Sequence, residues 1–291
     1  MNMAVRPAAS LAPDFRPGPV LRVFGMRRSG NHAILDGFLR NAPGGNAVFL
    51  NNCKKAQDPL ASHRSLELRR GGAPVRVTDE LNDLGATLAQ AGPRPLTIVS
   101  VEDAMPGDRD LACPRPIWDS EEQVVVIYRG FLNWAASLLR KIKGNSRYGA
   151  MERARIMTNA CRTYGRALEL VSRPGAVHAV LYDRWIASEG YRRDTLQALG
   201  LDTRDLGLGE VQRYGGGSSF QPDARDARAL ATDRRAEMLA DDPEFGLLLW
   251  LVAHEPDLAE RIAAHFPADA ERILRLAETA GLTFHLPEGV R

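Results

Sequence analysis

The chain has 291 residues, of which 44% are hydrophobic and 25% are charged. These fractions exclude a wholly disordered chain, and the length suits one large α/β domain or such a domain with a helical subdomain. The 38 Lys and Arg residues nearly balance the 36 Asp and Glu residues, so the net charge of +2 indicates no general affinity for polyanions and we expect no nucleic-acid partner.

Short apolar runs rich in β-branched residues alternate with helical patterns from residue 20 to residue 199. We expect strands at residues 20–25, 47–51, 75–78, 96–101, 124–128 and 177–182. We expect helices at residues 29–40, 57–70, 80–90, 132–141, 150–171 and 191–199, and loops at 104–120 and 206–222. This alternation predicts βαβ units, and hence an α/β fold with a parallel sheet flanked by helices.

The two ends of the chain differ from this α/β core, which we place at residues 20–222. Residues 1–19 are rich in Ala and Pro and lack the charged start and apolar run of a signal peptide, so we expect a flexible leader. Residues 223–291 read as a helical extension packed on the core, with breaks at prolines 243, 256 and 267.

Cysteine usage and hydropathy bear on the compartment. The three cysteines, Cys53, Cys113 and Cys161, lie far apart, without the spacing of a zinc site or a disulfide framework. No run of about 18 apolar residues occurs, so we expect no membrane span. A reduced, cytoplasmic setting follows as the expectation, and the oligomeric state stays open.

The strand at residues 20–25 ends in a segment with the frame of a phosphate-binding loop. Gly25 and Gly30 enclose four residues, and a helix follows. Glycines let backbone N–H groups turn toward an anion, and a helix N-terminus adds positive potential. An ATPase loop would continue with Lys and a magnesium-binding Ser or Thr, whereas this chain has Asn31 and His32. The alternative is a tight turn with incidental arginines, and for His32 we favour packing over catalysis.

A second candidate site follows the expected strand at residues 124–128. Arg129 ends that strand, and Ser137 lies eight residues later in the next helix. A parallel strand delivers Arg129 to the carboxyl edge of the sheet, where ligands of open α/β sheets bind. An arginine and a hydroxyl together can hold one phosphate group. The alternative is a surface ion pair for Arg129 and a hydroxyl bonded to its own helix for Ser137.

Together these segments resemble the sulfotransferase family that uses 3′-phosphoadenosine 5′-phosphosulfate (PAPS), in the form of a divergent bacterial member with a P-loop-type sheet. Residues 27–32 are similar to the family's loop for the 5′-phosphosulfate, and Arg129 with Ser137 to its motif for the 3′-phosphate. Residues 182–185 and 192–201 also resemble a family segment, and the Gly-rich residues 213–220 its loop over the 3′-phosphate. The resemblance implies contacts to PAPS from Arg27, Arg28, Ser29, Gly30, Asn31, His32, Arg129, Ser137, Arg213, Gly215, Gly216, Gly217 and Ser218.

The resemblance also implies a reaction. The sulfuryl group of PAPS would pass by in-line displacement to a hydroxyl or amine of a small-molecule or glycan acceptor, with no metal required. Arg28 occupies the position of the family's catalytic basic residue and would stabilise charge on the leaving phosphate. Because the pKa of an arginine stays above about 12, this role is electrostatic.

A candidate base follows the expected strand at residues 96–101. Glu102 and Asp103 stand at its carboxyl end, where a carboxylate can take the acceptor's proton if burial raises its pKa. We expect Glu102 to be this base. The alternative for either carboxylate is to cap the following segment or to pair with an arginine, and we expect His63 at the surface.

Two other functions stay open from the sequence. A kinase or NTPase with a degenerate P-loop would use Glu102 and Asp103 to hold magnesium, and would therefore require that metal. A nucleotide-binding module would keep the loop but lack turnover. A magnesium titration separates the first from a sulfotransferase, and an assay of transfer separates the second.

Overall fold

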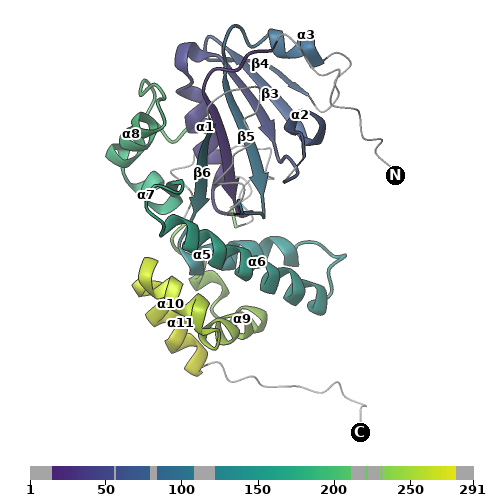
Figure 1. Ribbon diagram of the computed structural model, residues 1–291. Coiled ribbons are helices and arrows are strands. Elements are labelled where there is room, and N and C mark those ends of the chain that lie inside the picture. The colour runs from purple at the N-terminus through teal and green to yellow at the C-terminus, as the bar shows by residue number, and fades with distance from the viewer. Residues whose placement is uncertain are drawn as a thin grey trace. The chain divides into compact units, whose positions relative to one another are not determined.

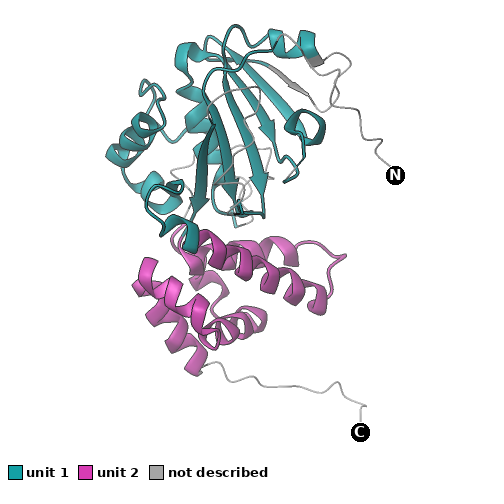
Figure 2. Cartoon of the chain, viewed as in Figure 1, with its two compact units in different colours: residues 1–129, 169–230 teal, residues 130–168, 231–291 magenta. Residues whose placement is uncertain are grey.

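The computed structural model describes residues 15–55, 57–78, 84–107, 122–210, 220–221, 230 and 232–279 (Figure 1). The chain forms two compact units, coloured separately in Figure 2. We call residues 1–129 and 169–230 the sheet unit, and residues 130–168 and 231–291 the helical unit. Residues 130–168, which the sequence groups with the α/β core, thus share a unit with the C-terminal helices.

A seven-stranded sheet runs through the sheet unit in the order β4-β3-β2-β5-β1-β6-β7. The strands are β1 (Val20–Gly25), β2 (Ala47–Asn51), β3 (Ser65–Arg70), β4 (Ala73–Thr78), β5 (Leu96–Glu102), β6 (Glu122–Tyr128) and β7 (His178–Leu181). The strand pairs β2–β5, β5–β1, β1–β6 and β6–β7 are parallel. In contrast, β3 pairs antiparallel with both β2 and β4. The α/β class with flanking helices is confirmed, but the expectation of a purely parallel sheet is wrong.

The antiparallel hairpin also overturns the helix expected at residues 57–70. Only α2 (Pro59–Ser62) is helical there, and β3 follows it. Leu66 and Leu68 are buried and alternate with charged residues, which is the period of a strand. The glycine pair 71–72, with φ of 59° and 86°, then joins β3 to β4. A two-residue Gly-Gly turn between such runs is typical of a hairpin, and it outweighs the helical pattern.

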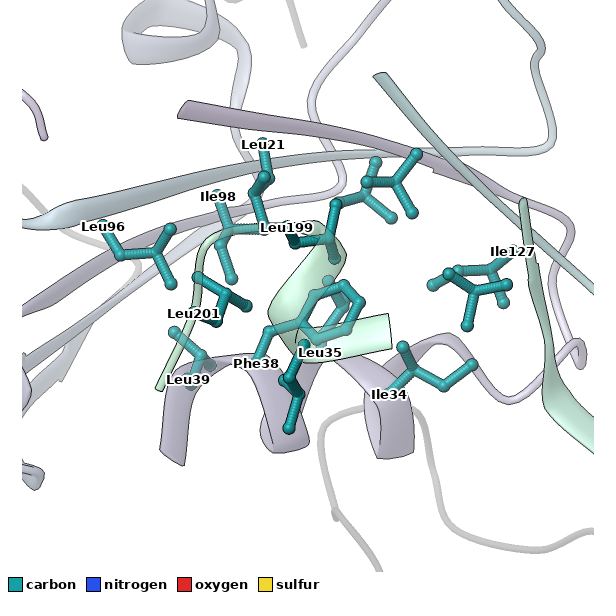
Figure 3. Close-up of a cluster of buried hydrophobic side chains, with 14 of the residues drawn as sticks. Leu21, Ile34, Leu35, Phe38, Leu39, Leu96, Ile98, Ile127, Leu199 and Leu201 are labelled. Carbon is teal, nitrogen blue, oxygen red and sulfur yellow. The ribbon is translucent and has the colours of Figure 1, made fainter. Parts of the chain in front are cut away.

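The main hydrophobic core lies between the sheet and helices α1 (Asn31–Arg40), α7 (Tyr182–Ala187) and α8 (Glu189–Ala198), as Figure 3 shows in part. Alternate positions of the strands supply core side chains such as Leu21, and the helical spacing of α1 supplies Ile34 and Phe38. Burying each such side chain stabilises the fold by about 1.5–3 kcal/mol. Helix α1 is therefore fixed along its length against the strands that carry the candidate site.

The remaining described elements of the sheet unit are short. A 3-10 turn, η2 (Pro43–Gly45), precedes β2, and α3 (Leu84–Ala89) precedes β5. Before β1, the Gly18 N–H donates to the Pro95 carbonyl at 2.8 Å and Phe15 is 8% exposed. The last residues of the expected leader therefore pack on this unit, while residues 1–14 lie outside the described residues.

The helical unit contains α5 (Phe131–Lys143), α6 (Ala150–Val171, to residue 168), a 3-10 turn η6 (Glu237–Leu239), α9 (Pro243–Ala253), α10 (Pro256–His265) and α11 (Pro267–Thr279). The three prolines that break the C-terminal pattern each begin a helix, where the missing N–H costs no hydrogen bond. Trp134 of α5 stacks on Tyr164 of α6, with ring centroids 4.5 Å apart. Aromatic packing thus joins the first two helices of this unit.

Candidate functional site

Neighbouring parallel strands end side by side at the carboxyl edge of the sheet. β1 lies between β5 and β6, and its last residue, Gly25, is in register with Glu102 on β5 and with Ile127 on β6. The chain passes from β1 to β2 across β5, and from β5 to β6 across β1. Connections that leave two adjacent strands in opposite directions mark the place where open α/β sheets bind ligands. The segments that follow these strands are therefore the candidate site.

The loop after β1 has a backbone that few residues adopt. The Ser29 N–H donates to the Met26 carbonyl at 3.1 Å and closes a turn. Within this turn Arg28 has a φ of 70°, and directly after it Gly30, the N-cap of α1, has a φ of 86°. A left-handed backbone costs a residue with a side chain about 1–2 kcal/mol, whereas glycine adopts it freely. Arg28 is thus held in a strained conformation of the kind that clusters at functional sites.

Side chains from β5 and α1 hold the loop in this shape. Asp103, the residue after β5, accepts the Arg27 N–H at 2.8 Å and forms an ion pair with the Arg27 guanidinium. Asn31 Nδ2 donates to the Met26 carbonyl at 3.1 Å. Gly25 has no room for a Cβ atom, which would overlap the Asn31 amide. Asp103 therefore pairs with an arginine, which is the alternative to a role as the base.

Buried polar atoms at the start of α1 lack partners. Within the described part of the chain, Ser29 Oγ, Asn31 Oδ1 and His32 Nε2 are buried and have no hydrogen-bond partner. Ser29 is 0% exposed and Asn31 is 7% exposed. Burying such an atom without a partner costs about 1–3 kcal/mol, so the arrangement favours a ligand. The Ser29 hydroxyl can donate to an anion, which the helix N-terminus also attracts.

Two positively charged side chains meet at the loop, Arg28 within it and Arg129 beside it. Arg129, directly after β6, is 1% exposed, and its Nη1 donates to the Arg28 carbonyl at 3.4 Å. Burial lowers the pKa of Arg28 and the charge of Arg129 lowers it further, against the opposing effects of Tyr182 and Glu102. The Arg129 Nε is 3.8 Å from the Asp183 carboxylate. An anion bound beside two arginines would relieve their repulsion, so the electrostatics favour a negatively charged group here.

A small pocket lies beside the loop, lined by residues of β1, β2, β5 and α1. Its polar lining consists of Asn31, His32, Asn51, Ser100 and Glu102. Burial raises the pKa of Glu102, and the charge of Asp103 raises it further, although Asn31 opposes this by hydrogen bonding. Burial, and then the charge of Arg28, lower the pKa of His32. The pocket thus joins a carboxyl group with a raised pKa and an imidazole with a lowered pKa, two groups that can take part in proton transfer.

The sequence-predicted residues are divided between the two units. The loop, Glu102 and Arg129 belong to the sheet unit, where Arg129 is buried and has the half-exposed Asp183 as an ion-pair partner. Ser137 belongs to the helical unit, where its hydroxyl accepts a hydrogen bond from Nη1 of Arg235 at 2.8 Å. His63 is half-buried, with Nδ1 2.9 Å from the Pro59 carbonyl. The predicted residues Arg213, Gly215, Gly216, Gly217 and Ser218 lie outside the described residues.

Two further side chains carry contacts that the sequence reasoning assigned to no site. Arg235 is 4% exposed and contacts Ser137, yet no local pattern in its arginine-rich segment marks it. Tyr182 is 4% exposed and lies under the Arg129 guanidinium. The sequence could have indicated Tyr182, because it comes directly after β7, which neighbours the strand that ends before Arg129.

The chain matches no family model, no curated protein and no solved structure among those with which it was compared. No helix in the described ranges is long and apolar enough to cross a membrane. Those ranges also contain no group of three or more His, Cys, Asp or Glu residues placed to hold a metal ion. Burial raises the pKa of Cys53 and of Cys161 to about 12, which makes both thiols poor nucleophiles.

Proposed function

We propose that this chain is a PAPS-dependent sulfotransferase with a P-loop-type fold, acting in the cytoplasm on a hydroxyl or amine of a small-molecule or carbohydrate acceptor. The observation that carries the proposal is the loop after β1, with its strained Arg28, its buried Ser29 hydroxyl and the start of α1 beside Arg129. Each feature favours a bound phosphate or sulfate group. The motifs that resemble the family supply the choice of PAPS among such ligands.

The residues present fit the 5′-phosphosulfate end of PAPS. The Ser29 hydroxyl, buried and without a partner among the described residues, can donate to a phosphate oxygen. The first N–H groups of α1, from Asn31 and His32, add donors at the positive end of the helix. The guanidiniums of Arg27 and Arg28 balance the negative charge. When bound, PAPS supplies the activated sulfuryl group.

The chain's own residues then have two tasks. Arg28 holds positive charge where the leaving phosphate gains negative charge, so its contact strengthens in the transition state. Glu102 takes the proton from the acceptor hydroxyl or amine. Its register position beside Gly25 places it at the base of the loop, and burial raises its pKa, which makes the carboxylate a stronger base.

The 3′-phosphate is assigned to Arg129, Ser137 and the Gly-rich residues 213–218 by the resemblance alone. In the sheet unit Arg129 has a second task, because it donates to the Arg28 carbonyl and so supports the loop. In the helical unit Arg235 contacts the Ser137 hydroxyl, which places a cation beside this residue. Loss of Arg129 should therefore affect both phosphates, and not the 3′-phosphate only.

The kinase or NTPase alternative is less well supported. It needs Glu102 and Asp103 as acids for magnesium, yet Asp103 uses both carboxylate oxygens on Arg27. The nucleotide-binding module differs from the proposal only in lacking turnover.

Calorimetry with three nucleotides tests the proposal. We expect 3′-phosphoadenosine 5′-phosphate (PAP) to bind more tightly than AMP, which lacks the 3′-phosphate, by about 1.5–3 kcal/mol, or roughly 10-fold to 150-fold. ATP should bind more weakly than PAP, with or without magnesium. Labelled PAPS, offered with a panel of alcohols and amines, then measures transfer of sulfate.

Three other results of these measurements would contradict the proposal or favour one of its alternatives. Equal affinity for PAP and AMP contradicts the choice of PAPS. Magnesium-dependent preference for ATP favours a kinase or NTPase, and tight PAP binding without transfer to any acceptor favours the binding module. Arg129→Ala is the companion variant: we expect weaker binding of both PAP and AMP, because Arg129 also supports the loop.

A further inference from the structure

Tyr182 belongs to a segment that the sequence motifs single out, and the proposed function gives it no task. It is the first residue of α7 and follows directly after β7. β1, β6 and β7 are neighbouring parallel strands. Because parallel strands end at the same edge, they deliver the loop, Arg129 and Tyr182 to one place. Tyr182 is 4% exposed there, so its ring is packed against these neighbours.

The Tyr182 ring contacts the loop through Gly30. A Cβ atom at Gly30 would overlap three carbon atoms of the ring, and the φ of 86° also favours glycine at this position. Trp185, one turn along α7, packs in the same way on Gly37 of α1. Two glycine–aromatic contacts thus hold α7 against α1, and the first of them lies at the helix start that forms part of the anion site.

The same ring also contacts Arg129. The guanidinium carbon of Arg129 is 5.1 Å from the centroid of the Tyr182 ring, within the range of a cation–π interaction. From this position Arg129 Nη1 donates to the Arg28 carbonyl at 3.4 Å. An aliphatic side chain could fill the volume, but it has no negative ring face for the guanidinium. The ring therefore links Gly30 and Arg129, which border the strained Arg28 turn.

We propose that Tyr182 is a positioning residue for the anion-binding loop. Its ring fixes Gly30 and Arg129, and Arg129 in turn holds the carbonyl of Arg28. The inference rests on the proposed function in one respect, namely that the loop binds a phosphate-bearing ligand. It implies that the loop requires the aromatic ring.

The test compares Tyr182→Phe with Tyr182→Leu in the full chain. Calorimetry measures binding of PAP and of inorganic pyrophosphate, and amide exchange follows the Ser29 N–H, which closes the turn. We expect Tyr182→Phe to stay closer to the wild type than Tyr182→Leu in both measurements, because it keeps the ring. We expect Tyr182→Leu to weaken binding of both probes and to speed Ser29 exchange, each by about tenfold or more. If the Leu variant does not fold, Tyr182→Met replaces it, because the unbranched Met side chain adapts more readily to the space that the ring leaves.

Tyr191→Leu is the matched control. Tyr191 also has an arginine over its ring, Arg184 at 4.5 Å, but its hydroxyl bonds the backbone at β7. This variant should lower the melting temperature without changing binding or Ser29 exchange. A folded Tyr182→Leu variant with wild-type Ser29 exchange overturns the role of Tyr182. If the wild type binds neither probe, the proposed function fails, and the exchange comparison still decides the inference.

Discussion

The two ends of helix α1 carry charged groups in opposite arrangements. At its C-terminal half, Asp36 lies 2.9 Å from Nη2 of Arg69 and 2.9 Å from Nε of Arg40, and Glu67 lies 2.7 Å from Nε of Arg69. Arg40 also pairs with Asp205. In this network each positive group faces a negative one.

At the N-terminal end of α1 the pattern is reversed. Arg28 and Arg129 have like charges and influence each other, and buried polar atoms of Ser29 and Asn31 have no partner among the described residues. The charges of the first arrangement are paired within the protein, whereas the second contains buried polar atoms of Ser29 and Asn31 that have no partner among the described residues. The two ends of α1 therefore differ in how far their polar groups are satisfied within the described residues, and we expect substitutions at the two ends to affect different properties.

Arg28→Ala should give the largest effect at the N-terminal end. We expect turnover to fall by about 1,000-fold, because the contact strengthens as the leaving phosphate gains charge, with little change in PAP affinity. Transfer assays with labelled PAPS and calorimetry measure the two quantities. Arg94→Ala is the control for backbone strain, since Arg94 is exposed and also has a positive φ, of 44°. Near-wild-type turnover in Arg28→Ala would show that Arg28 has no catalytic role.

Asp36→Ala should give the largest loss of stability at the C-terminal half. Removing this carboxylate, which is 6% exposed, leaves Arg69 and Arg40 without their shared partner. Breaking a buried ion pair typically costs about 3–5 kcal/mol, and we expect about 3 kcal/mol in urea denaturation. PAP affinity measured well below the midpoint should stay unchanged. A selective loss of PAP binding in a fully folded variant would contradict the separation of the two ends.

Glu102→Gln tests the proposed base and its cost to the fold. We expect turnover to fall by about 100-fold with an alcohol as acceptor, while PAP affinity is kept. The wild-type rate should rise with pH through the raised pKa of Glu102, above the ordinary 4.5, because the carboxylate must be deprotonated.

The stability of the same variant supplies the control. A raised pKa in the folded state stabilises the protein below pH 4.5, and this contribution is lost as pH rises through the folded-state pKa. At neutral pH the ionised Glu102 therefore costs stability, and Glu102→Gln should melt at or above the wild-type temperature. A lower melting temperature with unchanged turnover would make Glu102 a capping residue.

The smallest expected effect concerns His32. Burial and the charge of Arg28 lower its pKa below 6.5, so the imidazole is neutral at pH 7. The unfolded chain then binds the proton more readily, and stability should decline as pH falls below 6.5. NMR titration of the imidazole should show the low pKa, and Arg28→Ala should raise it toward 6.5. If the pKa of His32 is unchanged in that variant, the charge of Arg28 does not act on His32.

Much of the fold follows from local patterns in the sequence. The strands at 20–25 and 47–51 and the helix at 150–171 are found with the predicted bounds. Buried parallel strands read as continuous apolar runs, and a long helix repeats its apolar positions, so each needs only its own residues to be recognised. The segments that carry Arg28, Glu102 and Arg129 could be placed at one sheet edge for the same reason.

Only the tertiary structure decided which of these residues meet. The sequence permits both Glu102 and Asp103 as the base, but the fold pairs Asp103 with Arg27. It likewise makes residues 65–70 an antiparallel strand between β2 and β4, and it places the Tyr182 ring on Gly30. These contacts join residues far apart in the chain, and they depend on which strands become neighbours in the sheet. A local pattern reports how a segment folds, but the approach of two distant side chains is set by the packing of the whole unit.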